Sequence, residues 1–256
     1  MDKEVKTWDK TAKNYFSEVV SPFAEGVDNP IFWYLDHKIV VDKKKMSVMD
    51  MGCGIGNFLP TLSKKFAKVV GFDFSPKMVD ISKDKVKNLK NVTVLVRDAR
   101  DLSEFYNQFD AVVTVNSILL PNIRDIEKMF KEAYNVLKQG GVLLGIFPAM
   151  ESFLYQALLI QEKYLDNGET QEEALKKAQA AIDEAPCDFA AGLVKYKDSV
   201  QKNYYLFELK HRLWKAGFSN IVVRKVYYPW EVYEEEELLA FRGRKKLWDW
   251  FVYAEK

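Results

Sequence analysis

Short apolar runs alternate with longer amphipathic stretches from about residue 46 to residue 148. The runs are rich in Val, Ile, Leu, Phe and Met, as strands buried on both faces of a parallel sheet should be. The stretches between them have the spacing of helices, so the pattern predicts an α/β fold with a parallel sheet. We expect strands over 47–51, 68–72, 92–96, 109–115 and 141–147, and helices over 57–66, 76–89 and 125–137.

Local signals mark two of the helix ends. Ser75 provides an N-cap hydroxyl, and Pro76 stands at the first helical position after it. The third helix runs into Lys138-Gln139-Gly140-Gly141, where glycine can take the left-handed conformation that closes a helix.

The flanking segments carry other patterns. Two or three helical pieces are expected before the core, broken at Ser21-Pro22 and Asn29-Pro30. Residues 150–200 are polar and helical, with no obvious strand. The end of the chain predicts a helix over 204–216 that stops at Gly217, followed by strands over 220–226 and 250–254. We expect four segments: an N-terminal helical cap over 1–45, a Rossmann-like ligand-binding core over 46–148, a helical insertion over 149–203, and a final helix and strand pair over 204–256.

Composition disfavours several classes of protein. The 38 Lys and Arg residues nearly balance the 37 Asp and Glu residues, and the net charge of +1 indicates neither a nucleic-acid nor a membrane partner. No stretch approaches the roughly 20 apolar residues that span a bilayer. The only two cysteines, Cys53 and Cys187, form no CxxC pair, which disfavours a disulfide scaffold and a zinc site. The first residues lack an apolar leader, so we expect a soluble, cytoplasmic protein. We also expect no bound metal.

The most informative stretch is Val48 to Phe58, VMDMGCGIGNF, which places Gly52, Gly54 and Gly56 between a strand and a helix. Absent side chains let backbone amides approach a ligand there, and the helix N-terminus favours negative charge. Several nucleotide binders share such a turn. The dinucleotide fingerprint needs a glycine or alanine where this chain has Asn57, which disfavours NAD.

Two acidic residues fall where a nucleoside would need them. Asp73 ends the second strand, about 20 residues past the first glycine, where a carboxylate can accept hydrogen bonds from both ribose hydroxyls. Asp98 follows the third strand and could accept from the exocyclic amino group of adenine. Either residue alone would more often be a solvated loop carboxylate or a helix cap. Together with the glycine turn they predict a nucleoside site, because ligands bind at the carboxyl ends of parallel strands.

These motifs resemble the class I S-adenosylmethionine-dependent methyltransferases of the small-molecule type. The resemblance covers residues 46–148, and further pieces lie at 8–15, 213–218 and 252–256. It implies a Rossmann-like seven-stranded sheet whose last strand is antiparallel, with helical insertions at the N-terminus and after the fifth strand. The motifs that carry it are residues 50–56, 71–78, 98–102, 109–112 and 136–141.

The resemblance also implies a role for each matching residue. The three glycines would pass beside the methionine part of S-adenosylmethionine, and Asp50 would help hold its amino group. Asp73 would bind the ribose, and Asp98 with the backbone of Ala99 would hold adenine. The expected cofactor-binding set is Tyr15, Asp50, Gly52, Cys53, Gly54, Gly56, Asp73, Phe74, Met78, Asp98, Ala99 and Asn116.

Within this set, Phe74 and Met78 would pack on the adenine plane, and Cys53 would be a small filler in the turn. Asn116 would lie beside the sulfonium and the substrate, and Tyr15 could close over the cofactor.

The expected reaction moves a methyl group to a small-molecule acceptor by in-line displacement and leaves S-adenosylhomocysteine. The protein would mainly supply orientation and desolvation, so no catalytic residue is named. His37 and His211 are both expected on the surface. Aromatic residues of the cap could line an apolar pocket or surround an organic cation, or could simply pack the cap helices onto the sheet. These residues are Phe32, Trp33, Tyr34, Phe153, Tyr155, Tyr204, Tyr205, Tyr227, Tyr228, Trp230 and Tyr233.

Two other functions stay open at this point. One is an NAD-dependent oxidoreductase. The other is a catalytically silent module that binds S-adenosylmethionine for regulation, because methyltransferases have no single catalytic residue whose absence would show loss of activity. The chain would act as a monomer or a homodimer, without nucleic acid.

Overall fold

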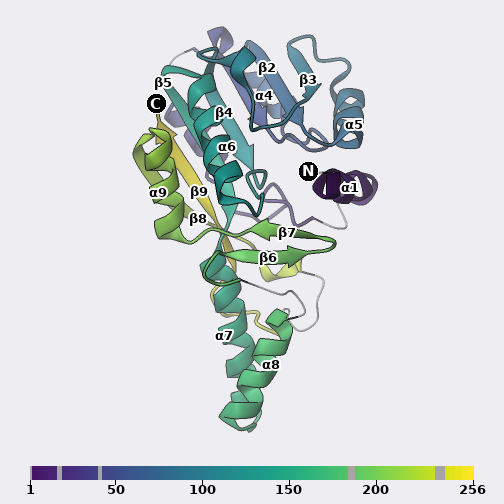
Figure 1. Cartoon of the computed structure of the whole chain (residues 1–256), viewed down its shortest axis with the longest axis vertical. Helices are drawn as coiled ribbons and strands as arrows, with labels where there is room; N and C mark the ends of the chain where they lie inside the picture. Colours follow the sequence, from purple (N-terminus) through teal and green to yellow (C-terminus); the bar gives the residue numbers. More distant parts are fainter. Residues whose placement is uncertain (1, 16–18, 40–41, 184–187, 234–239) are drawn as a thin grey trace.

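A seven-stranded sheet forms the centre of the computed structural model, which describes residues 2–15, 19–39, 42–183, 188–233 and 240–256 (Figure 1). Its strand order is β3-β2-β1-β4-β5-β9-β8. The first five strands pair in parallel, and β9 is antiparallel to both of its neighbours. The predicted α/β fold with an antiparallel last strand is confirmed. The strands are β1 (Ser47–Met51), β2 (Lys68–Asp73), β3 (Val92–Val96), β4 (Phe109–Val115), β5 (Leu137–Pro148), β8 (Ser219–Tyr227) and β9 (Trp248–Glu255).

Helices cover both faces of the sheet, which is why the strands are apolar at successive positions. Met49 of β1 belongs to one core cluster, together with residues of α6 (Ile123–Val136) and α9 (Leu206–Ala216). The adjacent Val48 belongs to the opposite cluster, with residues of α3 (Ile31–His37), α4 (Leu59–Lys65) and α5 (Pro76–Val86). Successive side chains of a strand point to opposite faces, so each strand contributes to both cores.

The predicted signals at two helix ends are confirmed. Ser75 accepts a hydrogen bond from the backbone N–H of Met78 at 3.2 Å and caps α5. Gly217 ends α9 with a φ of 115°, in the left-handed region that favours glycine.

The predicted end of the third helix is wrong. Helix α6 ends at Val136, and Leu137 is already extended and begins β5. Gly140 has a positive φ but lies inside this strand, where its N–H donates to the carbonyl of Lys256 at 3.1 Å. Pairing with the last residues of the chain therefore extends the strand, and that pairing is not visible in the local sequence. The first helix of the core also begins later than predicted, at Leu59.

The flanking segments are helical, as predicted, but one of them also holds two strands. Helices α7 and α8 lie side by side and project away from the sheet (Figure 1). The strands β6 and β7 form an antiparallel hairpin in the stretch predicted to have none, so that prediction is wrong. The remaining elements are α1 (Asp2–Thr11), η1 (Ala12–Asn14), η2 (Lys43–Lys45), η3 (Ser103–Phe105), α7 (Met150–Asp166), α8 (Gln171–Asp183), β6 (Leu193–Tyr196), β7 (Ser199–Lys202) and η4 (Trp230–Val232).

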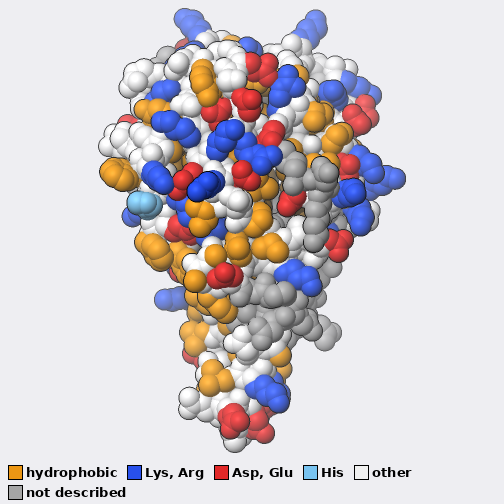
Figure 2. Space-filling view, viewed as in Figure 1, with side chains coloured by type: hydrophobic (Ala, Val, Ile, Leu, Met, Phe, Trp, Pro, Cys, Tyr) orange, Lys and Arg blue, Asp and Glu red, His pale blue; other side chains and the backbone are white. Residues whose placement is uncertain are grey.

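Charged side chains of both signs are interspersed over the part that holds the sheet (Figure 2), in keeping with the net charge of +1. Within the described ranges, no helix combines the length and the apolar character needed to cross a bilayer. Cys187 lies outside the described residues.

The insertion between β5 and α9 returns to the core at Tyr204, whose side chain is fully buried. Its hydroxyl donates to the carbonyl of Ile118 at 2.6 Å, and its ring packs edge-on against Phe130 and Phe147. The backbone of Tyr204 pairs with Pro148 and Met150, where the insertion begins. One residue therefore fastens both ends of the insertion to the core.

We expect Tyr204→Phe to destabilise the protein by about 1–3 kcal/mol, because the buried carbonyl of Ile118 loses its donor. Urea unfolding measures the change. The matched control Tyr227→Phe alters an exposed side chain and should stay within about 0.5 kcal/mol of the wild type. Equal stability of the two variants would contradict the assignment.

Candidate functional site

A pocket opens at the carboxyl ends of β1, β2 and β4, between the sheet, α1 and β7. The space within it is about 920 Å³, which includes open solvent at its mouth. Most of the residues expected from the sequence line it. These are Tyr15, Gly52, Gly54, Asp73, Phe74, Met78, Asp98, Ala99 and Asn116.

A smaller pocket of about 410 Å³ shares the walls Tyr15 and Gly52 with the first. Asp50 and Cys53, both expected at the site, line this second pocket. Gly56 is not among the described walls of either pocket. An ideal Cβ on Gly56 would lie 2.4 Å from the hydroxyl of Ser82, so this glycine lets the turn pack against α5.

Backbone contacts lock the glycine turn against the neighbouring strands. The Gly52 N–H donates to the carbonyl of Phe72 at 2.9 Å, and the Gly54 N–H donates to the carboxylate of Asp73 at 3.0 Å. Gly52 has a φ of 77°, and a Cβ there would lie 2.2 Å from the Cβ of Ser117. A side chain at this position would therefore push β1 and the end of β4 apart.

Two buried carboxylates flank this turn. Burial and the nearby charge of Asp73 raise the pKa of Asp50 to about 7. Burial also raises the pKa of Asp73 to about 6, although the backbone N–H groups of Ser75 and Gly54 offset part of that shift. Both shifts show that the residues around the turn disfavour a second negative charge. A ligand that brings positive charge or hydrogen-bond donors would relieve this cost.

Two neighbours of the carboxylates respond to the same environment. Burial and the charge of Asp73 raise the pKa of Tyr15 to about 12, so its phenol stays protonated. Burial also raises the pKa of the Cys53 thiol, so the thiol is no reactive nucleophile, in keeping with the prediction of a small filler.

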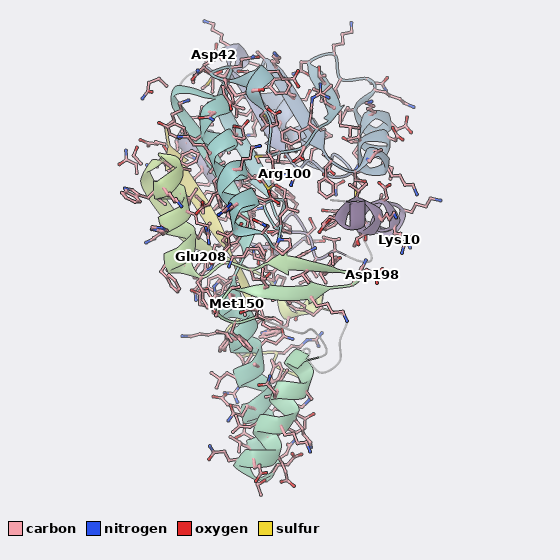
Figure 3. The ribbon with its side chains drawn as sticks, viewed as in Figure 1. Lys10, Asp42, Arg100, Met150, Asp198 and Glu208 are labelled. Atoms are coloured by element: carbon pink, nitrogen blue, oxygen red, sulfur yellow. The ribbon has the colours of Figure 1, made fainter. Side chains whose placement is uncertain are left out.

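Asp98 is held in place by Arg100, which reaches both carboxylate oxygens at 2.8–3.1 Å. Burial alone would raise the pKa of Asp98, but these hydrogen bonds lower it. Arg100, labelled in Figure 3, also pairs with Asp125 of α6 at 3.1 Å. Beside Asp98, Phe74 and the buried Met78 line the same pocket. This end of the pocket therefore joins a fixed anionic acceptor to apolar surface.

Asn116 follows β4 in a strained conformation, with a φ of 47°. Its amide nitrogen donates to the buried carboxylate of Asp249 at 3.3 Å. Burial raises the pKa of Asp249 to about 6. The amide oxygen of Asn116 is buried and has no hydrogen-bond partner among the described residues. The strained backbone and the unpaired polar atom make Asn116 a candidate ligand contact.

One wall of the pocket comes from the two cap segments, but the sequence analysis named none of its residues. Residues 199–201 of β7 line it from the insertion, and Trp8 of α1 lines it from the N-terminus. The two elements touch each other, since Trp8 stacks on Tyr196 with ring centroids 5.9 Å apart. The tip of the hairpin also reaches α1 through Asp198, whose carboxylate is 3.6 Å from the ammonium of Lys10 (Figure 3). The helix and the hairpin thus form one continuous cover.

The cap aromatics do not form this wall. None of the eleven named in the sequence analysis lines either pocket over the described ranges, and Tyr34, Tyr204, Tyr228 and Trp230 are buried in the cores instead. The alternative of ordinary packing applies to these four. His37 and His211 are exposed, as predicted. In the described part of the chain, no three His, Cys, Asp or Glu side chains gather as a metal site would require.

Comparison with known proteins gives matches to methyltransferases and to an enzyme named for S-adenosyl-L-methionine. Residues 48–141 match the methyltransferase-domain family. A demethylmenaquinone methyltransferase of Staphylococcus carnosus is 36% identical over 103 residues, which are 39% of this chain and 42% of that protein. A carboxy-S-adenosyl-L-methionine synthase of Staphylococcus epidermidis is 25% identical over 218 residues, which are 80% of this chain and 87% of that protein.

A crystal structure of a SAM-dependent methyltransferase from Aquifex aeolicus shares the fold with a TM-score of 0.56 at 21% identity, over 96% of this chain and 97% of that one. The chain spans about half the length, or less, of the curated relatives that it matches above 30% identity. The family match covers the strands and the glycine turn that build the pocket. Through these residues the chain resembles the class I S-adenosylmethionine-dependent methyltransferases.

Proposed function

We propose that the chain binds S-adenosylmethionine and transfers its methyl group to a small-molecule acceptor. The observation that carries this proposal is the pair of buried carboxylates, Asp50 and Asp73, on either side of the glycine turn. Their raised pKa values indicate that the site has too few positive charges and hydrogen-bond donors to stabilise both carboxylates in the ionised form. S-adenosylmethionine offers a sulfonium, an ammonium and two ribose hydroxyls.

The remaining polar residues fit the other parts of that molecule. Asp98 is an ionised acceptor for the adenine amino group, with Phe74 and Met78 as apolar neighbours. Asp50 lies in the adjoining pocket, where the methionine part would extend. When bound, S-adenosylmethionine supplies an already activated methyl group. The work left to the chain is to orient the acceptor and to exclude water, for which the cover formed by α1 and the hairpin is suited.

Small-molecule acceptors are favoured by the relatives. The demethylmenaquinone methyltransferase carries a small-molecule acceptor in its name, and it matches 39% of this chain. The pocket is also closed on one side by Trp8 and the hairpin, which suits a small ligand better than a polymer.

A second candidate is chemistry on the cofactor itself. The relative named carboxy-S-adenosyl-L-methionine synthase matches 80% of this chain, including part of the region outside the family match. Such a protein would yield a carboxylated cofactor rather than a methylated acceptor. Mass spectrometry of the cofactor after incubation with a carboxyl donor would separate the two reactions.

Calorimetric titration with S-adenosylmethionine, S-adenosylhomocysteine and NAD is the first test. Binding of the two adenosyl compounds without NAD would support the proposal. Binding of NAD alone would favour an oxidoreductase, and binding of none would overturn the cofactor assignment. Cofactor binding without transfer to any acceptor would favour the catalytically silent regulatory module.

We expect Asp73→Asn to weaken S-adenosylmethionine binding by roughly 10- to 100-fold, because a hydrogen bond to a charged acceptor contributes about 1.5–3 kcal/mol. Calorimetry measures the change. The matched control Asp80→Asn alters an exposed carboxylate of α5 outside the two pockets and should bind as the wild type does. Unchanged affinity in Asp73→Asn would remove this residue from the site.

We expect the ligand-free protein to lose stability as the pH rises from about 4 to about 7. The folded-state pKa of Asp50, about 7, lies above its unfolded value of about 3.9, so the folded state binds more protons in this window. Asp73 and Asp249, each with a pKa raised to about 6, act in the same direction.

Asp50→Asn removes the largest of these three shifts. Urea unfolding should show a shallower pH dependence in this variant and, at pH 8, a stability gain of roughly 1–4 kcal/mol over the wild type. Asp80→Asn should follow the wild-type curve. A variant at Asp50 with the full wild-type slope would show that its buried charge does not control the dependence.

A further inference from the structure

Two buried amide atoms of residues that line the larger pocket have no hydrogen-bond partner in the described chain, and they are of opposite kind. The amide oxygen of Asn116 is a hydrogen-bond acceptor, and the amide nitrogen of Gln201 is a donor. Buried polar groups are almost always paired, so two such atoms in one pocket point to a ligand that pairs them.

The orientation of the Asn116 amide is fixed. Its nitrogen is engaged by Asp249, which also accepts a hydrogen bond from the hydroxyl of Tyr228 at 2.6 Å. A flipped amide would bring the Asn116 oxygen against this carboxylate, so the oxygen stays unpaired. The strained backbone holds the side chain at that position.

The hairpin that carries Gln201 is also held firmly. The next residue, Lys202, donates its backbone N–H to Leu119 at 2.9 Å, and Leu119 itself lines the pocket. The Lys202 side chain is 1% exposed and pairs with Glu208 of α9 at 2.6 Å. Figure 3 labels Glu208 beside the base of the hairpin. The backbone that carries Gln201 is therefore preorganised and does not belong to a loose loop.

The surrounding wall on this side is apolar, with Leu119, Leu120 and Val200 among its residues. Asp98, Phe74 and Met78, which fit adenine, come from the other strands of the pocket. Asn116 and Gln201 thus belong to the wall formed by the insertion and by the segment after β4. This part is available to the acceptor.

We propose that Asn116 and Gln201 bind the acceptor, and that the acceptor presents a neutral group that both donates and accepts hydrogen bonds on an apolar frame. A primary carboxamide or a hydroxyl is such a group. An ammonium has donors only and could pair with the Asn116 oxygen but not with the Gln201 donor, and a carboxylate has acceptors only and could pair with Gln201 but not with Asn116. This inference rests on the proposed function, because it assigns the second substrate of the same site.

The test uses three probes of one shape: benzamide, benzoate and benzylamine. Each is titrated by ligand-detected NMR into the full chain saturated with S-adenosylhomocysteine. We expect benzamide to bind at least about tenfold more tightly than either charged probe. Gln201→Leu should weaken benzamide binding by about tenfold, equivalent to about 1.4 kcal/mol.

Two controls separate binding from a structural role. Gln171→Leu changes an exposed glutamine at the start of α8 and should leave benzamide binding unchanged. Gln201→Leu removes an unpaired buried donor, so its melting temperature should not fall below that of the wild type. A large fall in melting temperature would mean that Gln201 supports the fold, and the proposal would then fail.

The remaining outcomes are also decisive. Tighter binding of benzylamine or benzoate, binding of none of the probes, or equal benzamide binding by wild type and Gln201→Leu would each overturn the inference. Failure of S-adenosylhomocysteine to bind would instead overturn the proposed function, and it is measured before any probe is added.

Discussion

Parallel pairing of β1 with both β2 and β4 determines where the chemistry of this molecule lies. The register sets Met51 opposite Phe72 on one side and opposite Thr114 on the other. The residues that follow these three strands must then emerge together at one edge. The hydroxyl of Ser117 donates to the carbonyl of Met51, and the Gly52 N–H donates to that of Phe72, so the turn is fastened on both sides. The glycine turn, Asp73 and Asn116 depend on this edge, whereas Trp8 and Gln201 reach the pocket from α1 and from the hairpin.

Much of the fold and of the pocket could be predicted because buried parallel strands leave a strong local signal. The strands at 47–51, 92–96 and 109–115 have the predicted bounds. Asp73, the last residue of β2, and Asp98, two residues past β3, could be assigned to the pocket from their position in the sequence alone. The same reasoning could not give their ionisation, because the raised pKa of Asp73 and the lowered pKa of Asp98 depend on burial and on Arg100.

The wrong predictions of secondary structure share a physical cause. Leu137 begins a strand because β4 and the chain end pair with its segment, and the local sequence favours the end of a helix instead. The hairpin of β6 and β7 turns through Lys197, with a φ of 52°, without the Asn-Gly or Asp-Gly pair that announces such turns. Gln201 was missed with it. Tertiary contacts between distant segments outweigh weak local preferences at these places.

The closed base of the insertion affects how the sequence and the length of the insertion could change in evolution. Residues 148 and 204 are hydrogen-bonded neighbours although 55 residues lie between them. The geometry of the sheet therefore does not depend on the length of the insertion. Loops whose ends are already joined tolerate lengthening at small entropic cost. The hairpin could therefore be exchanged or shortened by evolution without disturbing the nucleoside end of the pocket. If the proposed function holds, changes in the insertion can alter the acceptor while the cofactor-binding residues of the sheet stay the same.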